Sequence, residues 1–600
     1  MNFSINDINL KSIPFSRQYS RIRIFEMPVE QGSNENGLFI TYSVNAPTNT
    51  IRFNLIQIIP EKDGKPLPYT YKADPGSLKI IAGGGEVEVC YDGREILRFR
   101  AQGGIDIVFK IKFQTHEQFL DRLDGTAYAA FTGLGEFLFE QNNGAQTYDS
   151  KWMGLEMKSA DTNVKWTPDA DGRIEGYIHH ADSFSERPDV QRDFDICVKE
   201  NLRDFSNWCD KYENVPEKYA HIRLLSIYVI WISMLGKGML MSDDMVVMTS
   251  IGPLPKAMGW QQGYHAMAIY KDIDQAVRFM HSMFICQDKY GEIPDGITDR
   301  LLFWANTKPP FQGFALMYIL DMIGMEALTK EHCELLYLPM CRWVDWWLTF
   351  RDRNNDGIAA YNHADESGWD DASIFCKGLP LATPDLAALL ILCMEACSKL
   401  AEKLGYSVEA EEWMERSKAM LQKMIEVFWN GEKFICVLDK TGEVVDEESI
   451  AVYQPIILGK RLPQEIIEKI AATISNPEMF YTEDGFTSES MKSRHFDTGS
   501  GAFVLGVIGA PMQLLLTVGL YNAGCKELAL KNAYNWCEKA LAMGPQTSRR
   551  DLYTPTPPPF EGYIPIFSLT PLPGCFSSWG PAVFLVLGQL LYNDLEERSR

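Results

Sequence analysis

The spacing of the hydrophobic positions changes along the chain. In about the first 190 residues, short runs of alternating, β-branched and aromatic residues are separated by turn sequences such as Asp63-Gly64. A two-residue period between glycine turns predicts strands. The predicted strands are Arg21–Phe25, Leu38–Val44, Ile51–Ile58, Leu78–Ile81, Glu86–Tyr91 and Ile105–Phe113, with a second set around Tyr128–Glu140, Trp152–Met157 and Gly176–His180. Many short strands of this kind predict a β-sandwich over residues 1–190.

After Pro216 the apolar residues fall at three- and four-residue spacing, which predicts helices. The predicted helices are Glu217–Leu240, His265–Gln287, Gln312–Ile323, Lys330–Arg351, Pro384–Leu404, Val408–Phe428, Pro463–Ile474, Gly501–Ala523, Lys526–Met543 and Ser577–Glu596. Residues 191–215 are predicted to be a linker with a helix. Paired helices without parallel strands predict one helical domain over 216–600. The periodicity alone is equally compatible with a barrel, a bundle or a solenoid.

Composition and charge narrow the class of function. The 600 residues include 57 Lys and Arg against 80 Asp and Glu, a net charge of −23. So acidic a chain argues against nucleic acid and anionic membranes as partners, and it suits a neutral substrate. The first residues, MNFSINDINLKSIPF, do not resemble a signal peptide, and Lys237 interrupts the most apolar helix candidate. We therefore expect a cytoplasmic protein that does not enter the membrane.

The 13 cysteines are dispersed without a CxxC pair. This pattern predicts reduced, mostly buried thiols, and no close spacing of Cys and His suggests a metal cluster. The oligomeric state cannot be inferred.

The richest chemistry lies in residues 354–373, NNDGIAAYNHADESGWDDAS, where glycines predict a loop between helices. Its carboxylates are Asp356, Asp365, Glu366, Asp370 and Asp371, with Trp369 among them. Clustered carboxylates supply general acids, general bases and hydroxyl ligands, and tryptophan supplies a platform for a sugar ring. From composition alone, a solvated acidic loop or a calcium turn remains an alternative.

The motif Glu366-Ser367-Gly368-Trp369-Asp370 resembles the E-S-G-x-D signature of inverting glycosidases. These enzymes are the α-glucosidase I and mannosylglycerate hydrolase group, glycoside hydrolase family 63, and trehalases of family 37 have a close variant. The resemblance implies an N-terminal β-sandwich followed by an (α/α)6 barrel. It also implies that Asp370 is the general acid.

A second segment, Pro559-Phe560-Glu561-Gly562-Tyr563, resembles the ending of the same family. By that resemblance Glu561 is the general base, and Trp579 lines the sugar site. The spacing departs slightly from the family pattern at Phe560 and Trp579. The resemblance therefore implies an acid and a base from two distant segments.

Further substrate contacts follow from the resemblance. Trp260 and His265 fit a family segment in which Gln261 stands where the family has Asp. An amide can still bridge two sugar hydroxyls, since it both donates and accepts. Trp304 is expected to stack on a second sugar. Glu366 and Trp369 are expected to contact the substrate, with Glu366 binding a hydroxyl.

One family segment, Y-W-R-G-P-x-W, is missing before residue 501, where this chain has HFDTGSGAF instead. This departure, together with Gln261, leaves the sugar and the linkage open.

A calcium-like pattern precedes the acidic loop. Asp352, Asn354 and Asp356 occupy ligand positions 1, 3 and 5, but His363 stands at position 12 in place of the bidentate Glu. The sequence therefore favours a plain turn. We expect no cofactor, with calcium as the one ion that the pattern leaves open.

The sequence predicts an inverting exo-acting glycoside hydrolase that cleaves a bond in an oligosaccharide or glycoside, α-glucosidic by resemblance. A carbohydrate-binding protein or a sugar-isomerising epimerase on a helical barrel is the alternative. A phosphorylase is disfavoured, because no Lys or Arg lies within ten residues of Glu561 to hold phosphate.

Overall fold

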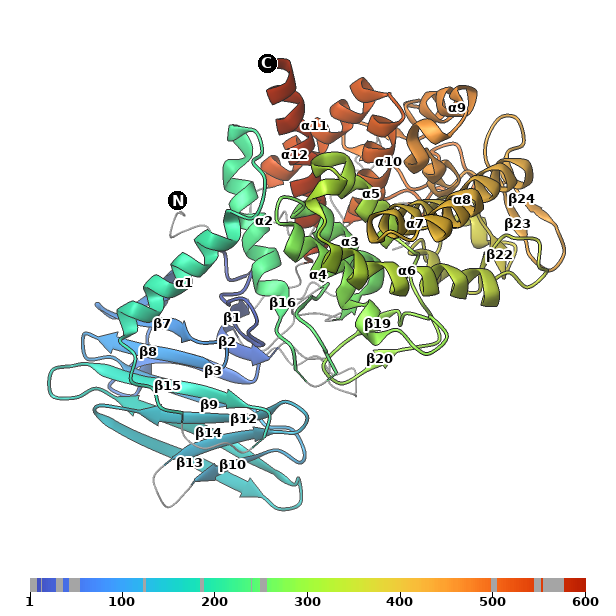
Figure 1. Ribbon diagram of the computed structural model, residues 1–600. Helices are drawn as coiled ribbons and strands as arrows, with labels where there is room; N and C mark the ends of the chain where they lie inside the picture. The colour runs from blue at the N-terminus through green and yellow to red at the C-terminus, as the bar shows by residue number, and fades with distance from the viewer. Residues whose placement is uncertain are drawn as a thin grey trace.

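The computed structural model describes residues 8–11, 13–27, 36–42, 54–121, 126–183, 188–238, 240–248, 256–497, 504–543, 552–553 and 577–599. A β-rich N-terminal part lies beside a larger helical part (Figure 1). No helix in these ranges is both long enough and apolar enough to cross a membrane.

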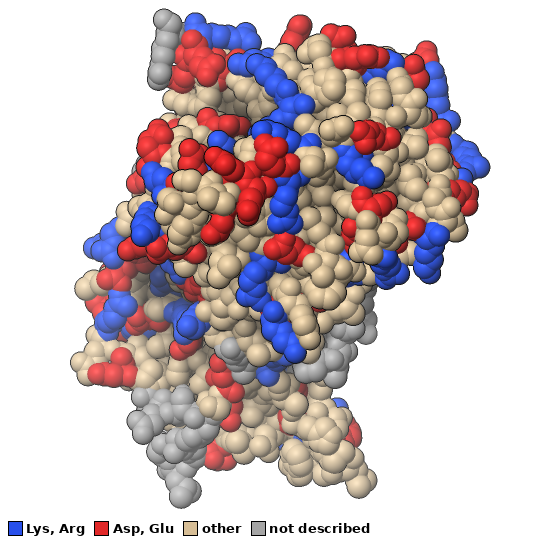
Figure 2. Space-filling view, turned by 45° about the vertical axis from the view of Figure 1, so that its right-hand side comes forward, with Lys and Arg blue, Asp and Glu red and all other residues tan. Residues whose placement is uncertain are grey.

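Acidic and basic side chains are mixed across the face of the molecule that Figure 2 shows. The net charge of −23 therefore does not give this face a single sign.

The N-terminal part contains two antiparallel sheets. The first has seven strands: β1 (Ile22–Met27), β2 (Gly37–Tyr42), β3 (Ile56–Lys62), β4 (Lys65–Pro66), β9 (Asp106–Ile111), β13 (Ala145–Met153) and β14 (Lys158–Thr167). The second has eight: β5 (Tyr69–Ala73), β6 (Leu78–Ala82), β7 (Gly85–Asp92), β8 (Ile96–Gln102), β10 (Gln118–Asp121), β11 (Ala127–Phe131), β12 (Gly135–Gln141) and β15 (Ile174–Ala181).

Aromatic side chains join the two sheets face to face. Phe99 of β8 makes edge contacts with Phe109 of β9 and Trp166 of β14, at centroid distances of 5.3 and 5.7 Å. All three side chains are buried. Such edge-to-face pairs add stability beyond the area they bury. The predicted β-rich N-terminal region is confirmed, and its strands pair antiparallel.

The helical part contains α2 (Ala220–Ser233), α3 (Gly259–Ala268), α4 (Ile273–Ser282), α5 (Gln312–Ile323), α6 (Lys330–Phe350), α7 (Pro384–Leu404), α8 (Ser407–Phe428), the 3-10 helix η7 (Ile450–Arg461), α9 (Gln464–Ile474), α10 (Ala510–Asn522), α11 (Lys526–Met543) and α12 (Trp579–Ser599). Between the two parts, α1 (Phe194–Cys209) lies against β7.

Six of these helices contact one another in a closed ring. The ring runs α3, α5, α7, η7, α10, α12 and back to α3. Its members are buried on nearly all sides, whereas α8 exposes one face. Close approach requires a glycine at the contact of α5 with α7, where a Cβ on Gly313 would lie 2.4 Å from the Cα of Cys393. The remaining helices lie outside this ring and alternate with its members along the chain.

Most predicted helices lie where expected, and the corrections have physical causes. The single helix predicted over His265–Gln287 is wrong, because α3 ends at Ala268 and α4 begins at Ile273, with Asp272 capping the second helix. The helix predicted from Gly501 begins only at Ala510. Helix η7 was not predicted, because Pro455 and the positive φ of Gly459 disturb its helical pattern.

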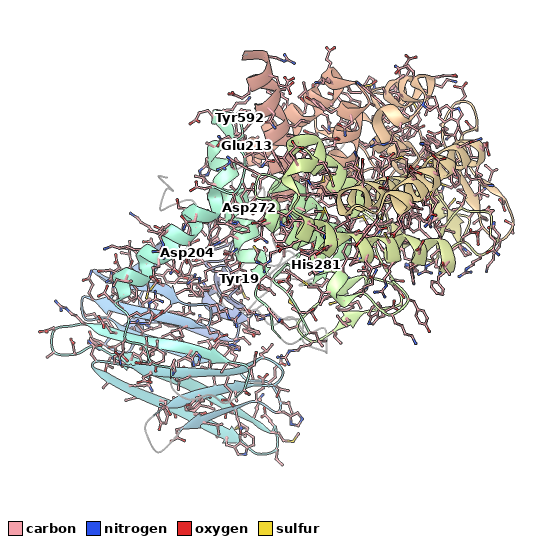
Figure 3. All side chains as sticks on the ribbon, viewed as in Figure 1. Tyr19, Asp204, Glu213, Asp272, His281 and Tyr592 are labelled. Carbon is pink, nitrogen blue, oxygen red and sulfur yellow. The ribbon has the colours of Figure 1, made fainter. Side chains whose placement is uncertain are left out.

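The N-terminal segment joins the two parts. The backbone NH of Tyr19 donates to the carbonyl of Met234 after α2, and Arg17 pairs with Asp204 of α1 at 3.0 Å. Figure 3 shows Tyr19 at this junction and Asp204 on α1. The guanidinium of Arg21 donates to both carboxylate oxygens of Asp299, at 2.6 and 2.5 Å, in the helical part. A buried ion pair therefore connects the sheets to the helical part.

Candidate active site

Residues from five places on the chain converge at one end of the helical ring. The loop after α6 contacts Trp260 at the start of α3 and Lys308 before α5, and Trp260 in turn contacts Trp579 at the start of α12. The backbone NH of Val504, before α10, donates to Asp371 at 2.8 Å. The candidate site thus lies at the N-terminal ends of the ring helices.

The glycine of the acidic motif shapes the loop. After the short 3-10 turn η5 (Ala364–Ser367), Gly368 takes a left-handed conformation with φ of 74°. A Cβ at Gly368 would lie only 2.2 Å from the ring of Trp260. No larger residue fits there without displacing that ring, so Gly368 lets the loop turn directly over α3 and present Asp370.

Glu366 is fully buried, and its carboxylate accepts hydrogen bonds from within the protein. It accepts from Arg351 at 2.7 Å and from the backbone NH of Asn362 at 2.7 Å. Burial is the largest cause that raises the pKa of Glu366, and Arg351 opposes it. The predicted hydroxyl ligand therefore holds the loop to the end of α6 from inside the protein.

Asp370 is the motif carboxylate that reaches solvent. Protein surrounds it on its other sides, and the resulting removal from bulk water is the largest cause that raises its pKa to about 6. Lys308 works against this rise, whereas Asp365, Asp371 and Asp295 add to it. A carboxyl group with such a pKa can exist in its protonated form near neutral pH.

Lys308 is the centre of a buried ion cluster beside Asp370. Its ammonium lies 2.8 Å from Asp365 Oδ1 and 3.2 Å from Asp295 Oδ1, and its side chain is only 4% exposed. Lys256 pairs with Asp295 on the other side. Burial is the largest single influence and would raise the pKa of Asp365, but Lys308, Lys256 and His363 together outweigh it and lower that pKa. The cluster keeps Asp365 ionised next to Asp370.

Three of the four predicted tryptophans form one buried cluster. The ring of Trp260 makes edge contacts with Trp369 at 6.2 Å and with Trp579 at 4.9 Å. The indole NH of Trp369 donates to Gln454 at 3.1 Å. All three are buried, so they line the protein beneath the loop.

Gln261 and His265 are buried in a polar network with Ser578. The Gln261 amide donates to Ser578 Oγ at 2.7 Å, and His265 Nε2 lies 3.2 Å from the same oxygen. Burial lowers the pKa of His265 to about 3, so the imidazole is neutral. The network connects α3 to the start of α12.

Trp304, by contrast, is 41% exposed. It follows the short strand β20 (Leu302–Phe303) and precedes Asn306, whose amide donates to Asp365 at 3.4 Å. Trp304 therefore stands at the rim of the acidic loop, where an aromatic face is accessible.

The calcium-like turn is closed by its own backbone. Asp352 accepts from the NH groups of Asp356 and Gly357 at 3.0 and 2.8 Å, and Asn354 also accepts from Asp356. Asp356 accepts from the NH of Ile358. The side-chain oxygens that suggested calcium therefore accept hydrogen bonds within the turn itself. Glu561, the predicted base, lies outside the described residues.

Comparison with known structures defines the class of fold. A bacterial glucoamylase complexed with acarbose is similar over 98% of this chain and 94% of its own, with a TM-score of 0.59 and 10% identity. At that identity the likeness concerns the fold alone. It supports a β-sheet part and a helical part arranged as in that protein.

The sequence of the helical part matches a known family over part of its length. Residues 254–540 match the family described as "Mannosylglycerate hydrolase MGH1-like glycoside hydrolase domain". This match confirms the resemblance of the helical part to the family 63-like glycoside hydrolases. No curated protein matches the chain.

Two further structures are similar at lower TM-scores. Mannosylglycerate hydrolase from Thermus thermophilus, in complex with Tris and D-glycerate, has 16% identity and a TM-score of 0.48 over 61% of this chain and 99% of that one. Neutral trehalase from Saccharomyces cerevisiae has 15% identity and a TM-score of 0.45 over 59% and 75%.

Proposed function

We propose that the protein is an inverting exo-glycoside hydrolase in which Asp370 is the general acid and Glu561 the general base. The observation that carries the proposal is Asp370 itself. Within a glycoside hydrolase domain, a solvent-accessible carboxyl with a pKa of about 6 stands at the convergence of the ring helices. A group of that kind can protonate a leaving glycosidic oxygen.

We also propose that the helical part is an (α/α)6 barrel. The support is the closed ring α3, α5, α7, η7, α10 and α12, with the remaining helices alternating outside it. In such a barrel, loops at one end of the inner helices bring distant segments together. The proposed domain limits remain 1–190, 191–215 and 216–600.

In the proposed mechanism, Asp370 gives its proton to the glycosidic oxygen as the bond to the anomeric carbon breaks. Glu561 removes a proton from the water that attacks the opposite face of that carbon. Inversion requires roughly 6.5–9.5 Å between the two carboxyl groups to hold this water. Asp370 then regains a proton from solvent.

Solvent exposure divides the predicted substrate-binding residues into two groups. Trp304 is accessible, and we propose that it stacks on a sugar at the rim. We propose positioning roles for Glu366, Trp369, Trp260, Gln261, His265 and Trp579, because they are buried and contact one another or the loop. The proposed substrate is an oligosaccharide or glycoside with an α-glucosidic bond, and the proposed location is the cytoplasm.

The test is a screen of nitrophenyl glycosides and natural disaccharides by anomer-resolved NMR, with wild type and Asp370→Asn. We expect the wild type to release a sugar of inverted configuration and Asp370→Asn to lose about 10²–10⁴ in rate. Asp371→Asn, which changes the neighbouring carboxylate, is the matched control. Wild-type-like turnover by Asp370→Asn would refute the assignment. Binding without sugar release would favour the carbohydrate-binding alternative.

A further inference from the structure

Three side chains from distant segments lie together in the helical part. The strands β23 (Cys436–Leu438) and β24 (Val444–Val445), close to one of them in the chain, run at the right-hand edge of Figure 1. Cys376 precedes β22 (Leu381–Ala382), and Glu447 follows β24. His495 is the third. One ligand atom from each lies within 4.8 Å of the others.

The separations match those of ligands around one metal ion. Cys376 Sγ lies 3.5 Å from Glu447 Oε1, and His495 Nε2 lies 3.5 Å from Glu447 Oε2. Zinc bonds of about 2.0–2.3 Å in a tetrahedral arrangement place neighbouring ligand atoms about 3.3–3.8 Å apart. These distances run to different oxygens of Glu447, and the three ligand atoms lie within 4.8 Å of one another, so side-chain rotations that bring them closer would place all three around one ion.

The cluster already holds a cation. The guanidinium of Arg494 donates to Glu447 at 2.7 Å and to His495 Nε2 at 3.0 Å. Arg494 therefore occupies lone pairs that a metal ion would use. Its side chain is 71% exposed, so it can turn into solvent without leaving a buried charge behind.

The nearby lysine side chains form ion pairs with acidic residues other than Glu447. Lys377 pairs with Glu443, and Lys433 pairs with Asp446 and Glu448. Cys376 is exposed, so an ion can reach the thiol from solvent.

We propose that Cys376, Glu447 and His495 bind a zinc ion, with water as the fourth ligand, in competition with Arg494. Thiolate, imidazole and carboxylate form a mixed set that suits zinc, and three protein ligands leave one position for water. On binding, the sulfur–hydrogen bond of Cys376 is replaced by a sulfur–zinc bond, and the proton passes to solvent. The ion takes no part in the hydrolysis proposed above.

Bound zinc would link the end of the acidic loop to the segment that contains His495. Cys376 lies six residues after Asp370, and His495 lies in the segment that leads to Val504, whose NH donates to Asp371. The ion would join these two segments through Glu447. We therefore expect zinc to raise the thermal stability of the full chain.

The experiment is a titration of the full, chelator-treated chain with Co²⁺, followed by displacement with Zn²⁺. Cobalt bound to a thiolate absorbs in the near ultraviolet, so the readout needs no substrate. We expect about one cobalt per chain with this band. Cys376→Ser should abolish the band, and His495→Ala should weaken binding at least as much as the roughly 10–100-fold cost of losing an outer-shell partner.

Arg494→Gln provides the sharpest variant, because it removes the competing cation. We expect it to bind cobalt several-fold more tightly than the wild type. Cys286→Ser and His281→Gln are matched controls that should leave the titration unchanged. The proposal is refuted if the wild type shows no band, if Cys376→Ser keeps it, or if Arg494→Gln binds no more tightly. Circular dichroism checks the folding of each variant.

Discussion

Lys308 donates to Asp365 at 2.8 Å, five residues before the proposed general acid Asp370. The two partners act on Asp370 in opposite directions, since Lys308 lowers its pKa and Asp365 raises it. Because the general acid works in its protonated form, activity should fall as pH rises through about 6. At pH 7 about a tenth of the Asp370 carboxyls would carry the proton.

Variants of Lys308 and Asp365 should shift the alkaline limb of the pH–activity profile, where activity falls as pH rises, in opposite directions. Lys308→Met removes the cation, raises the pKa of Asp370 and shifts the limb to higher pH. Asp365→Asn removes a carboxylate, lowers that pKa and shifts the limb to lower pH. The measurement is kcat/KM across pH 4–9, with Lys308→Arg as the control that keeps the charge. Two limbs that shift in the same direction would contradict the assignment of Asp370.

Gly368 should tolerate no side chain. Gly368→Ala places a Cβ against Trp260 and strains a left-handed residue, so we expect a loss of about 2–5 kcal/mol in the free energy of unfolding. Gly357→Ala is the matched control, because Gly357 has φ of 85° in open space and should lose only about 1–2 kcal/mol. Chemical denaturation measures both. Equal losses would show that Trp260 moves aside freely.

Arg351 and Glu366 test whether the buried motif glutamate positions the loop. Arg351→Met leaves the Glu366 carboxylate buried without its cation, which should cost about 3–5 kcal/mol in stability. Removing both charges, with Arg351→Met and Glu366→Gln together, should restore part of that loss. If Glu366→Gln instead keeps full stability but strongly raises KM, that result would favour the direct contact of Glu366 with substrate that the motif suggests.

Glu561 is tested by chemical rescue. Glu561→Ala should lose hydrolysis by about 10²–10⁴-fold, because no base activates the water. Azide can then attack an activated glycoside directly while Asp370 still serves the leaving group. We expect a glycosyl azide of inverted configuration, identified by NMR. Normal hydrolysis by this variant would place the base elsewhere.

Much of the fold could be predicted because its signals are local. Helices such as Pro384–Leu404 follow from apolar spacing, and the antiparallel strands follow from alternation between glycine turns. The prediction of Asp370 as the general acid came from a five-residue motif, and it stays a prediction. Helix η7 could not be predicted, because its short turns and Pro455 carry no clear periodicity.

The partners of the site residues could not be predicted, because they depend on contacts between distant segments. Lys308 looks ordinary in its proline-rich segment, and only the fold brings it against Asp295 and Asp365. Burial likewise separates the tryptophans, since Trp304 is exposed and Trp260 is not. The cluster of Cys376, Glu447 and His495 could not be predicted either, because more than a hundred residues separate Cys376 from His495 in the sequence.

The ion pair between Arg21 and Asp299 limits how the protein can be shortened. Cutting the chain before Glu217 would remove the guanidinium that pairs with Asp299 and would expose the surface of the helical part that the sheet part covers. The cut would also remove the carbonyls of Pro14 and Ser16, to which the Tyr228 hydroxyl lies close enough to donate. The helical part is therefore expected to fold poorly when expressed alone, and adding the sheet part as a separate polypeptide should restore it.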